Sequence, residues 1–307
     1  MTAKASFNSS FLQPRYWSTW CLLGINRLCV YLPRRWALGV GGVLGVLFLK
    51  LNAKRRRITR INIEMCFPEL NETQRESLVR EHFRCYGQSV VDFGLIWWAS
   101  EKKLDQLTDI KGLEEFRNLV EADRNIILLT PHAIGMDFGG VAVSRLHPTV
   151  SMMKPLKNEL LNYFVLRGRE RYPSTRIVMR DDGLRPMIRG IRNHQACYYI
   201  PDEDFGAESS VFVPFFGIPT ATLPTLGRMT QITNAAVVPC FTCLTDNGRY
   251  EVTLKPALEN YPSGDIEQDA QRMNMELEQG LRAMPAQYMW TLRWFKTTVD
   301  GSESPYA

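Results

Sequence analysis

The chain has 307 residues, of which 45% are hydrophobic and 22% are charged, a composition that excludes a largely disordered or collagen-like protein. A mean hydropathy of −0.19 excludes a polytopic membrane protein. The net charge of +5 is unevenly spread: residues 1–60 hold eleven Lys or Arg and no Asp or Glu, whereas the rest of the chain holds 26 basic and 32 acidic residues. A basic, apolar start before a mildly acidic body favours membrane attachment over nucleic-acid binding, because nucleic-acid proteins usually carry their basic surface on the folded body.

Two apolar stretches lie in this basic start, at residues 16–32 and 36–49. The second stretch is uncharged but only fourteen residues long, shorter than the roughly 20 residues that cross a bilayer as a helix. Tryptophans near both stretches suit the headgroup level of a membrane, and the basic cluster at 54–57 is expected on the cytoplasmic side. We therefore predict that residues 1–60 form a membrane anchor with a basic juxtamembrane segment. One tilted span and an embedded helical hairpin both fit, and a buried soluble hairpin is the alternative.

The rest of the chain, residues 61–307, is predicted to form one domain in which strands alternate with helices. Asn71 and Gln74 form a capping-box pattern, which predicts the start of a helix that runs to about residue 99. Strands are predicted at 126–130, 150–153, 176–179, 196–201, 211–215, 236–244 and 250–255, and helices at 136–146, 157–171, 184–192, 224–233 and 266–283. This alternation predicts an α/β fold with a mostly parallel central sheet flanked by helices, whose ligands bind near the carboxyl ends of the strands.

Only one of the four histidines lies where α/β enzymes keep reacting groups. His132 follows the apolar strand predicted at 126–130 and precedes a glycine-rich turn. Asp137 lies five residues further on, near the start of the next predicted helix, and a turn there could bring its carboxylate back to the imidazole. Such a carboxylate fixes the tautomer of the ring and lets its other nitrogen deprotonate a hydroxyl. The alternative is a histidine that merely caps the helix.

Two charged clusters also lie at the ends of predicted elements. Arg167, Arg169 and Arg171 end a predicted helix, and the acidic residues 202–204 follow a predicted strand. Arginine in a pocket suits a phosphorylated ligand, whereas the alternative is a solvated helix end beside a turn. We see no cluster with metal-ligand spacing and no Gly-x-Ser-x-Gly elbow of a serine hydrolase.

Five longer blocks of sequence, taken together, carry a resemblance to a known family. The chain resembles the late acyltransferases of lipid A biosynthesis, in the lysophospholipid acyltransferase superfamily, with the lauroyl-transferring type most similar. The blocks are Pro-Arg-Tyr-Trp-Ser-Thr-Trp at 14–20, Asn-Ile-Glu-Met-Cys-Phe-Pro-Glu at 62–69, Tyr-Ile-Pro-Asp-Glu-Asp-Phe-Gly at 199–206, Ser209 to Phe216, and a last block of Gln-Tyr-Met-Trp at 287–290 with Arg-Trp-Phe-Lys-Thr at 293–297.

The resemblance implies an O-acyltransferase of lipopolysaccharide biosynthesis that needs no cofactor and no metal. It would move a fatty acyl group from acyl carrier protein to a 3-hydroxyacyl hydroxyl of a lipid A precursor of the Kdo2-lipid IVA type. His132 and Asp137 match the family's catalytic dyad, although the lauroyl-transferring enzymes carry Glu at the second position. Arg169 matches a substrate-binding arginine, and Asp202 is grouped with it, expected to hold Arg169 or a backbone turn.

The resemblance also implies a location and partners. The protein would sit in the bacterial inner membrane, by an anchor or transmembrane helix, with its catalytic domain facing the cytoplasm. Acyl carrier protein and the lipid A precursor would be its partners, and nucleic acid would not. The alternative function is an acyltransferase that acts on lysophosphatidate or glycerol 3-phosphate in phospholipid synthesis.

Overall fold

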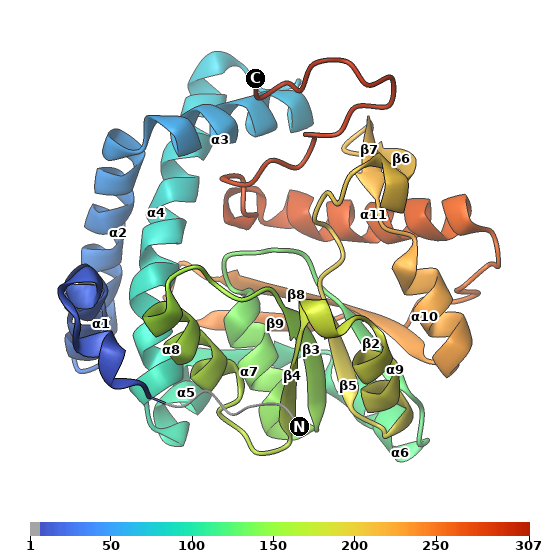
Figure 1. Ribbon diagram of the computed structural model, residues 1–307, viewed down its shortest axis with the longest axis horizontal. Coiled ribbons are helices and arrows are strands. Elements are labelled where there is room, and N and C mark those ends of the chain that lie inside the picture. Colours follow the sequence, from blue (N-terminus) through green and yellow to red (C-terminus); the bar gives the residue numbers. More distant parts are fainter. Residues whose placement is uncertain (1–6) are drawn as a thin grey trace.

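A seven-stranded, mostly parallel sheet lies at the centre of the protein (Figure 1), whose computed structural model describes residues 7–307. Every neighbouring pair is parallel except β8 with β9, which is antiparallel. The predicted α/β fold with a mostly parallel sheet is therefore confirmed. In spatial order the strands are β1 (Thr108–Lys111), β9 (Tyr250–Leu254), β8 (Ala236–Leu244), β2 (Ile126–Leu129), β5 (Ala196–Tyr199), β3 (Thr149–Met153) and β4 (Thr175–Met179).

The central strands read as unbroken apolar runs because both faces of the sheet are covered. In β2, Ile127 and Leu129 face the largest core cluster, which also holds residues of α9 and α11, whereas Ile126 and Leu128 face a second cluster built with α7. The helices that flank and connect these strands are α5 (Glu101–Leu107), α6 (Leu113–Glu121), α7 (Met136–Leu146), α8 (Glu159–Arg169), α9 (Arg185–Arg192), α10 (Thr225–Thr233) and α11 (Ile266–Ala283).

Several elements of the structure were not predicted from the sequence. Strand β1 has only four residues and alternates between half-buried and exposed at the edge of the sheet, so it lacks the apolar signal of the centre. The strand predicted at 211–215 exists as β6 (Val211–Phe215), but it pairs with the unpredicted β7 (Ile218–Thr222) in a separate antiparallel hairpin. Helices α5 and α6 were also not predicted.

The helices that come before α5 and β1 in the chain are α1 (Trp17–Cys29), α2 (Arg34–Leu51), α3 (Ala53–Cys66) and α4 (Glu72–Trp98). The expected capping box starts α4, with hydrogen bonds of 3.0 and 2.9 Å in its two directions. Helix α2 packs closely on α4 through glycines, and a Cβ added at Gly45 would come within 2.0 Å of the Phe83 carbonyl oxygen. A buried ion pair between Arg34 and Asp92, with two nitrogen–oxygen contacts of 2.5 and 2.6 Å, ties the same two helices together.

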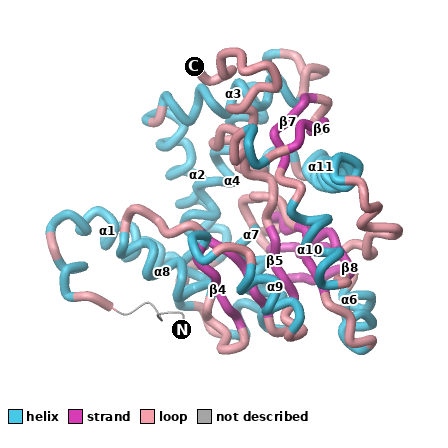
Figure 2. Tube along the Cα trace, turned by 45° about the vertical axis from the view of Figure 1, so that its right-hand side comes forward, coloured by secondary structure: helices cyan, strands magenta, loops and turns pink. Residues whose placement is uncertain are grey.

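Helix α1 extends away from the sheet and lies beside α8 (Figure 2). Phe11, Tyr16 and Leu23 pack there against Leu160 and Phe164 of α8. Large apolar side chains of α1, α2 and the turn between them are exposed to solvent, among them Trp17, Leu28, Tyr31, Trp36, Val43, Val46, Leu47 and Leu51.

No single helix within residues 7–307 has the length and apolar character to cross a bilayer. Helices α2 and α3 meet that criterion only as a pair, and the chain bends by 95° between them. The membrane anchor stays a prediction, as does the division into residues 1–60 and 61–307. Residues 1–6 of that predicted anchor lie outside the described chain.

Candidate active site

The site forms where two neighbouring parallel strands end. In the register of β2 with β5, Leu129 is paired with Tyr199. His132 and Asp202 each follow their paired residue by three positions, so the two loops bring them to the same edge of the sheet. The sheet order that makes these strands neighbours is therefore what assembles the site, at the carboxyl ends where α/β folds place their ligands.

His132 is held by Asp202. The Asp202 Oδ1 atom lies 2.5 Å from Nδ1 of the imidazole, and Oδ2 accepts a 2.9 Å hydrogen bond from the backbone N–H of His132. The Asp202 side chain is 4% exposed, whereas that of His132 is 21% exposed. A carboxylate on Nδ1 fixes the proton there and leaves Nε2 as the basic nitrogen. Within the described chain Nε2 makes no hydrogen bond.

Asp137 pairs with Arg169 rather than with His132. The Arg169 Nε–H donates to Asp137 Oδ1 over 2.6 Å. Asp137 lies in the first turn of α7 and Arg169 is the last residue of α8, positions that favour an anion and a cation respectively because of the helix dipoles. This corrects two expected contacts: the carboxylate on the imidazole is Asp202, and Asp202 does not hold Arg169.

The charges around His132 act in opposite directions. Burial lowers the pKa of His132, but the charge of Asp202 and its hydrogen bond outweigh burial, and the net pKa is raised above the ordinary value. Glu203 adds to this rise and Arg169 opposes it. Burial would likewise lower the pKa of Arg169, and Asp137 raises it, so the guanidinium stays charged.

An open cavity of about 480 Å³ adjoins His132. Its wall is largely apolar, with Met152, Met153, Leu156, Val165, Ile200 and Leu223, and Lys154 and Arg180 add positive charge. A smaller space of about 30 Å³ adjoins Asp137, and the two spaces share Met136, Arg169, Tyr198 and Ile200 as lining.

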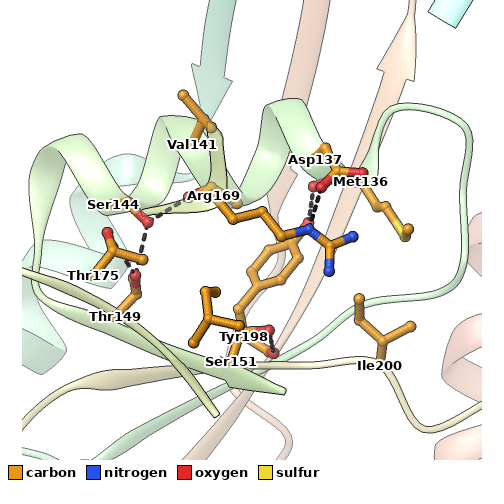
Figure 3. A pocket seen from close by; sticks show the side chains of 12 residues that line it. Met136, Asp137, Val141, Ser144, Thr149, Ser151, Arg169, Thr175, Tyr198 and Ile200 are labelled. Atoms are coloured by element: carbon orange, nitrogen blue, oxygen red, sulfur yellow. Dashed lines mark hydrogen bonds and ion pairs between the residues drawn. The ribbon is translucent and has the colours of Figure 1, made fainter. Parts of the chain in front are cut away.

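Figure 3 shows the Arg169 guanidinium beside Asp137 at the start of α7, with Tyr198 below it. The Tyr198 hydroxyl donates to the Met136 carbonyl oxygen over 2.8 Å, which fixes the first residue of that helix. Only Nε of Arg169 is hydrogen-bonded within the described chain, so the two terminal nitrogens can meet an anionic ligand.

The sequence analysis missed the residue that completes the contacts of Asp202. The Tyr288 hydroxyl donates to Asp202 Oδ2 over 2.9 Å. The block at 287–290 was noted only as part of a resemblance, because no local pattern shows that a C-terminal loop returns to the end of β5. Over residues 7–307, no three His, Cys, Asp or Glu side chains group as a metal site would require.

Comparison with known proteins places the chain in a family. A sequence profile described as bacterial lipid A biosynthesis acyltransferase matches residues 4–297. A lipid A biosynthesis acyltransferase of Haemophilus influenzae is 34% identical over 98% of this chain and 94% of its own. The lipid A biosynthesis lauroyltransferase of Escherichia coli is 30% identical over the full length of both chains, and the myristoyltransferase of that bacterium is 31% identical over 98% of this chain and 93% of its own.

Proposed function

The chain belongs to the bacterial lipid A biosynthesis acyltransferase family, and we propose from this premise a specific donor and acceptor for its acyl transfer. The donor is the thioester of acyl carrier protein. The acceptor is a 3-hydroxyacyl hydroxyl of a lipid A precursor of the Kdo2-lipid IVA type. The observation that carries the proposal is His132, held at Nδ1 by Asp202, at the wall of a large and mostly apolar cavity.

His132 acts as the general base in this proposal. A hydroxyl is a weak nucleophile until a positioned base takes its proton, which is worth about 10²–10⁴ in rate. Nε2 of His132 takes the proton of the acceptor hydroxyl as its oxygen attacks the thioester carbon. The new C–O bond forms, the C–S bond breaks, and the departing thiolate receives the proton back from the imidazolium. No acyl-enzyme is required.

Asp202 and Asp137 act through other groups rather than on the substrate. Asp202 keeps the imidazole in the tautomer whose Nε2 is basic. Asp137 keeps the Arg169 guanidinium at the cavity wall, where its terminal nitrogens bind a phosphate of the acceptor or stabilise the oxyanion on the thioester carbon. The apolar wall suits the acyl chains of donor and acceptor.

We also propose that the protein works at the cytoplasmic face of the bacterial inner membrane. The exposed apolar surface of α1 and α2 would lie in the headgroup region, as an in-plane attachment rather than a span. The excess of basic over acidic residues in 1–60 adds attraction to anionic lipid. Helix α1 packs on α8, which ends at Arg169, so this attachment would hold the cavity next to its lipid acceptor.

Vesicle flotation tests the attachment. Trp36 and Leu47 are 61% and 46% exposed on α2, and Met275 on α11 is a matched control at 57%. Trp36→Asp with Leu47→Asp should reduce binding to anionic vesicles at least tenfold and leave turnover of detergent-dispersed substrate intact. Met275→Asp should change neither. Unchanged flotation of the double variant would contradict the attachment.

Product analysis tests the reaction. The protein is incubated with acyl carrier protein thioesters of several chain lengths and with either a tetra-acylated lipid A precursor or lysophosphatidate. Mass spectrometry should find one added acyl group on the lipid A precursor and none on lysophosphatidate. The reverse result would assign the protein to phospholipid synthesis, and free fatty acid without acylated acceptor would identify a thioesterase.

The percentages of sequence identity to relatives do not show which acyl group this protein transfers. Relatives named for lauroyl, palmitoleoyl and myristoyl transfer are 30%, 29% and 31% identical to this chain. The panel of thioesters in the same assay therefore measures what sequence similarity leaves open.

A further inference from the structure

The C-terminal segment crosses the active site and holds the loop that carries His132. The backbone N–H of Met289 donates to the His132 carbonyl oxygen over 3.0 Å, and the N–H of Ile134 donates to the Gln287 carbonyl oxygen over 2.7 Å. Ala133 and Tyr288 form an antiparallel bridge between these two bonds. The loop is thus fixed on both sides of Ala133, directly after the histidine, by a segment from the far end of the sequence.

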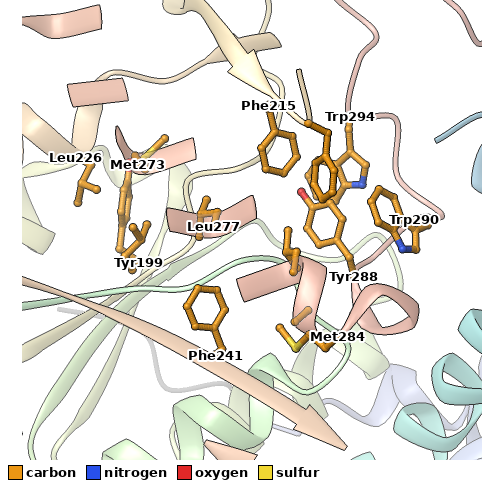
Figure 4. Packing of buried hydrophobic residues seen from close by; sticks show 14 of the residues in the cluster. Tyr199, Phe215, Leu226, Phe241, Met273, Leu277, Met284, Tyr288, Trp290 and Trp294 are labelled. Atoms are coloured by element: carbon orange, nitrogen blue, oxygen red, sulfur yellow. The ribbon is translucent and has the colours of Figure 1, made fainter. Parts of the chain in front are cut away.

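The same segment places one buried tyrosine next to the histidine's carboxylate. Tyr288 is fully buried, and its ring stacks on Trp294 with 4.6 Å between centroids and 14° between planes. It meets Trp290 edge to face at 4.8 Å, and Figure 4 shows these three rings grouped in the core. Since the ring has no freedom to turn away, its hydroxyl has a fixed position.

Asp202 has three hydrogen-bond donors, and two of them fix one oxygen. Oδ2 accepts from the Tyr288 hydroxyl and from the His132 backbone N–H, both over 2.9 Å. Oδ1 then faces only Nδ1 of the imidazole, at 2.5 Å. Because Oδ2 accepts two hydrogen bonds, the carboxyl group cannot rotate about its Cβ–Cγ bond without breaking them, and the Asp202 side chain is only 4% exposed to water that could replace them.

Tyr288 remains a donor over the working pH range. Burial and then the charge of Asp202 raise the pKa of the Tyr288 phenol far above its ordinary value. A neutral phenol beside a carboxylate can only donate its proton to it, which fixes the direction of this hydrogen bond.

We propose that Tyr288 is a positioning residue for the acyl transfer, because its hydroxyl fixes Asp202 in the orientation that keeps the proton of His132 on Nδ1. The proposal rests on the proposed role of His132 as the base. It makes the C-terminal segment part of the site: residues 287–290 supply both the backbone clamp on the histidine loop and the third member of a Tyr288–Asp202–His132 chain of hydrogen bonds.

The test removes one oxygen and nothing else. Tyr288→Phe keeps the stacked ring and deletes the hydroxyl. Tyr306→Phe is the matched control, because Tyr306 is also buried in the C-terminal region but hydrogen-bonds to Asn62 and to the Phe295 N–H, not to Asp202. Both variants lose a buried hydroxyl, so both should lose some thermal stability.

The pKa of His132 separates positioning from mere packing. The charged or titratable groups that influence it are Asp202, Glu203 and Arg169, and Tyr288 reaches it through Asp202. Without the Tyr288 hydroxyl, Asp202 loses one of the hydrogen bonds that stabilise its negative charge. The carboxylate then stabilises the protonated imidazole more strongly, which raises the pKa of His132. We therefore expect Tyr288→Phe to reduce kcat at least tenfold, to leave KM for the acceptor within about twofold, and to move the acid limb of the pH–rate profile to higher pH.

A readout that needs no turnover keeps this inference separate from the proposed function. The chain has four histidines, and the imidazole NMR signal absent from His132→Gln identifies His132. Its pKa should rise in Tyr288→Phe and stay unchanged in Tyr306→Phe. Should Tyr288→Phe not fold, 3-fluorotyrosine at position 288 gives a stronger donor and should lower that pKa. An unchanged His132 pKa in the Tyr288 variant, or an equal loss of kcat in both Phe variants, overturns the inference, whereas wild-type protein inactive with the lipid A precursor would overturn only the proposed function.

Discussion

Replacing Asp202 by Asn should invert the proton arrangement of His132. The Asp202 Oδ2 atom accepts two hydrogen bonds, from the His132 backbone and from Tyr288, so the amide oxygen of an asparagine must take that place. Its NH₂ group then lies where Oδ1 was, 2.5 Å from Nδ1 of the imidazole. An NH₂ group can only donate, so Nδ1 must accept and the proton moves to Nε2. Nε2 then cannot take the proton of the acceptor hydroxyl.

The expected loss in kcat for Asp202→Asn is about 10²–10⁴, or about 3–5 kcal/mol of transition-state stabilisation, the range for a general base placed in the wrong tautomer. The acid limb of the pH–rate profile, which reports the pKa of His132, should also move to lower pH. Asp202 is the main group that raises the pKa of His132, and burial and Arg169, which both lower it, remain in the variant.

Asp137→Asn is the informative comparison. It should also reduce kcat, because Arg169 loses the partner that holds it at the cavity wall. The acid limb should stay within a few tenths of a pH unit of the wild-type position, because the contacts of His132 with Asp202 are untouched. The assay is a pH series of kcat/KM with acyl carrier protein thioester and detergent-dispersed lipid A precursor. A limb that moves in Asp137→Asn and stays in place in Asp202→Asn would refute the assigned pairing.

Three further predictions concern stability. Gly45→Ala should lower the free energy of unfolding by about 1–3 kcal/mol, because the added Cβ would lie 2.0 Å from a backbone oxygen of α4, whereas Gly39→Ala, with nothing within 4 Å, should be neutral or slightly stabilising in the same urea titration. Asp92→Ala should cost about 3–5 kcal/mol by thermal melting, because it leaves Arg34 without its carboxylate in a largely buried site; a melting temperature equal to that of wild type would contradict this. His82 is buried and its pKa is lowered from 6.5 to about 4, so the unfolded chain binds a proton that the folded chain does not, and this stability is lost as pH falls from about 6.5 to 4. Between pH 7.5 and 5, the free energy of unfolding of wild type should fall by about 2 kcal/mol more than that of His82→Leu. Equal falls in the two proteins would show that His82 is not buried as a neutral ring.

The sequence located His132 and Asp202 better than it paired them. His132 and Asp202 were both found at the ends of apolar strands, since a buried parallel strand has a strong local signal. Their contact depends on β2 and β5 being neighbours, and 66 positions and two other strands separate Leu129 from Ala196 in the chain. Nothing local encodes that adjacency, so the nearer carboxylate, Asp137, was chosen as the partner of the histidine.

The N-terminal helices show a similar limit. The apolar stretch at 36–49 left one tilted span, an embedded hairpin and a buried soluble hairpin open, because composition could not show which face of it is covered. In the structure its glycine face packs on α4, and its Val43 and Leu47 face remains exposed. Likewise, the blocks at 199–206 and 287–290 were separate motifs in the sequence, and only the fold brings Asp202 and Tyr288 within hydrogen-bonding distance.

Acyl transfer by His132→Ala is the most direct measurement of whether an imidazole takes the acceptor's proton. The variant and wild type are compared at saturating acyl carrier protein thioester and detergent-dispersed lipid A precursor, with product quantified by mass spectrometry and folding checked by circular dichroism. We expect kcat to fall by at least about 10², with the circular dichroism spectrum unchanged. A folded His132→Ala protein whose kcat stays within tenfold of wild type would show that another group activates the hydroxyl.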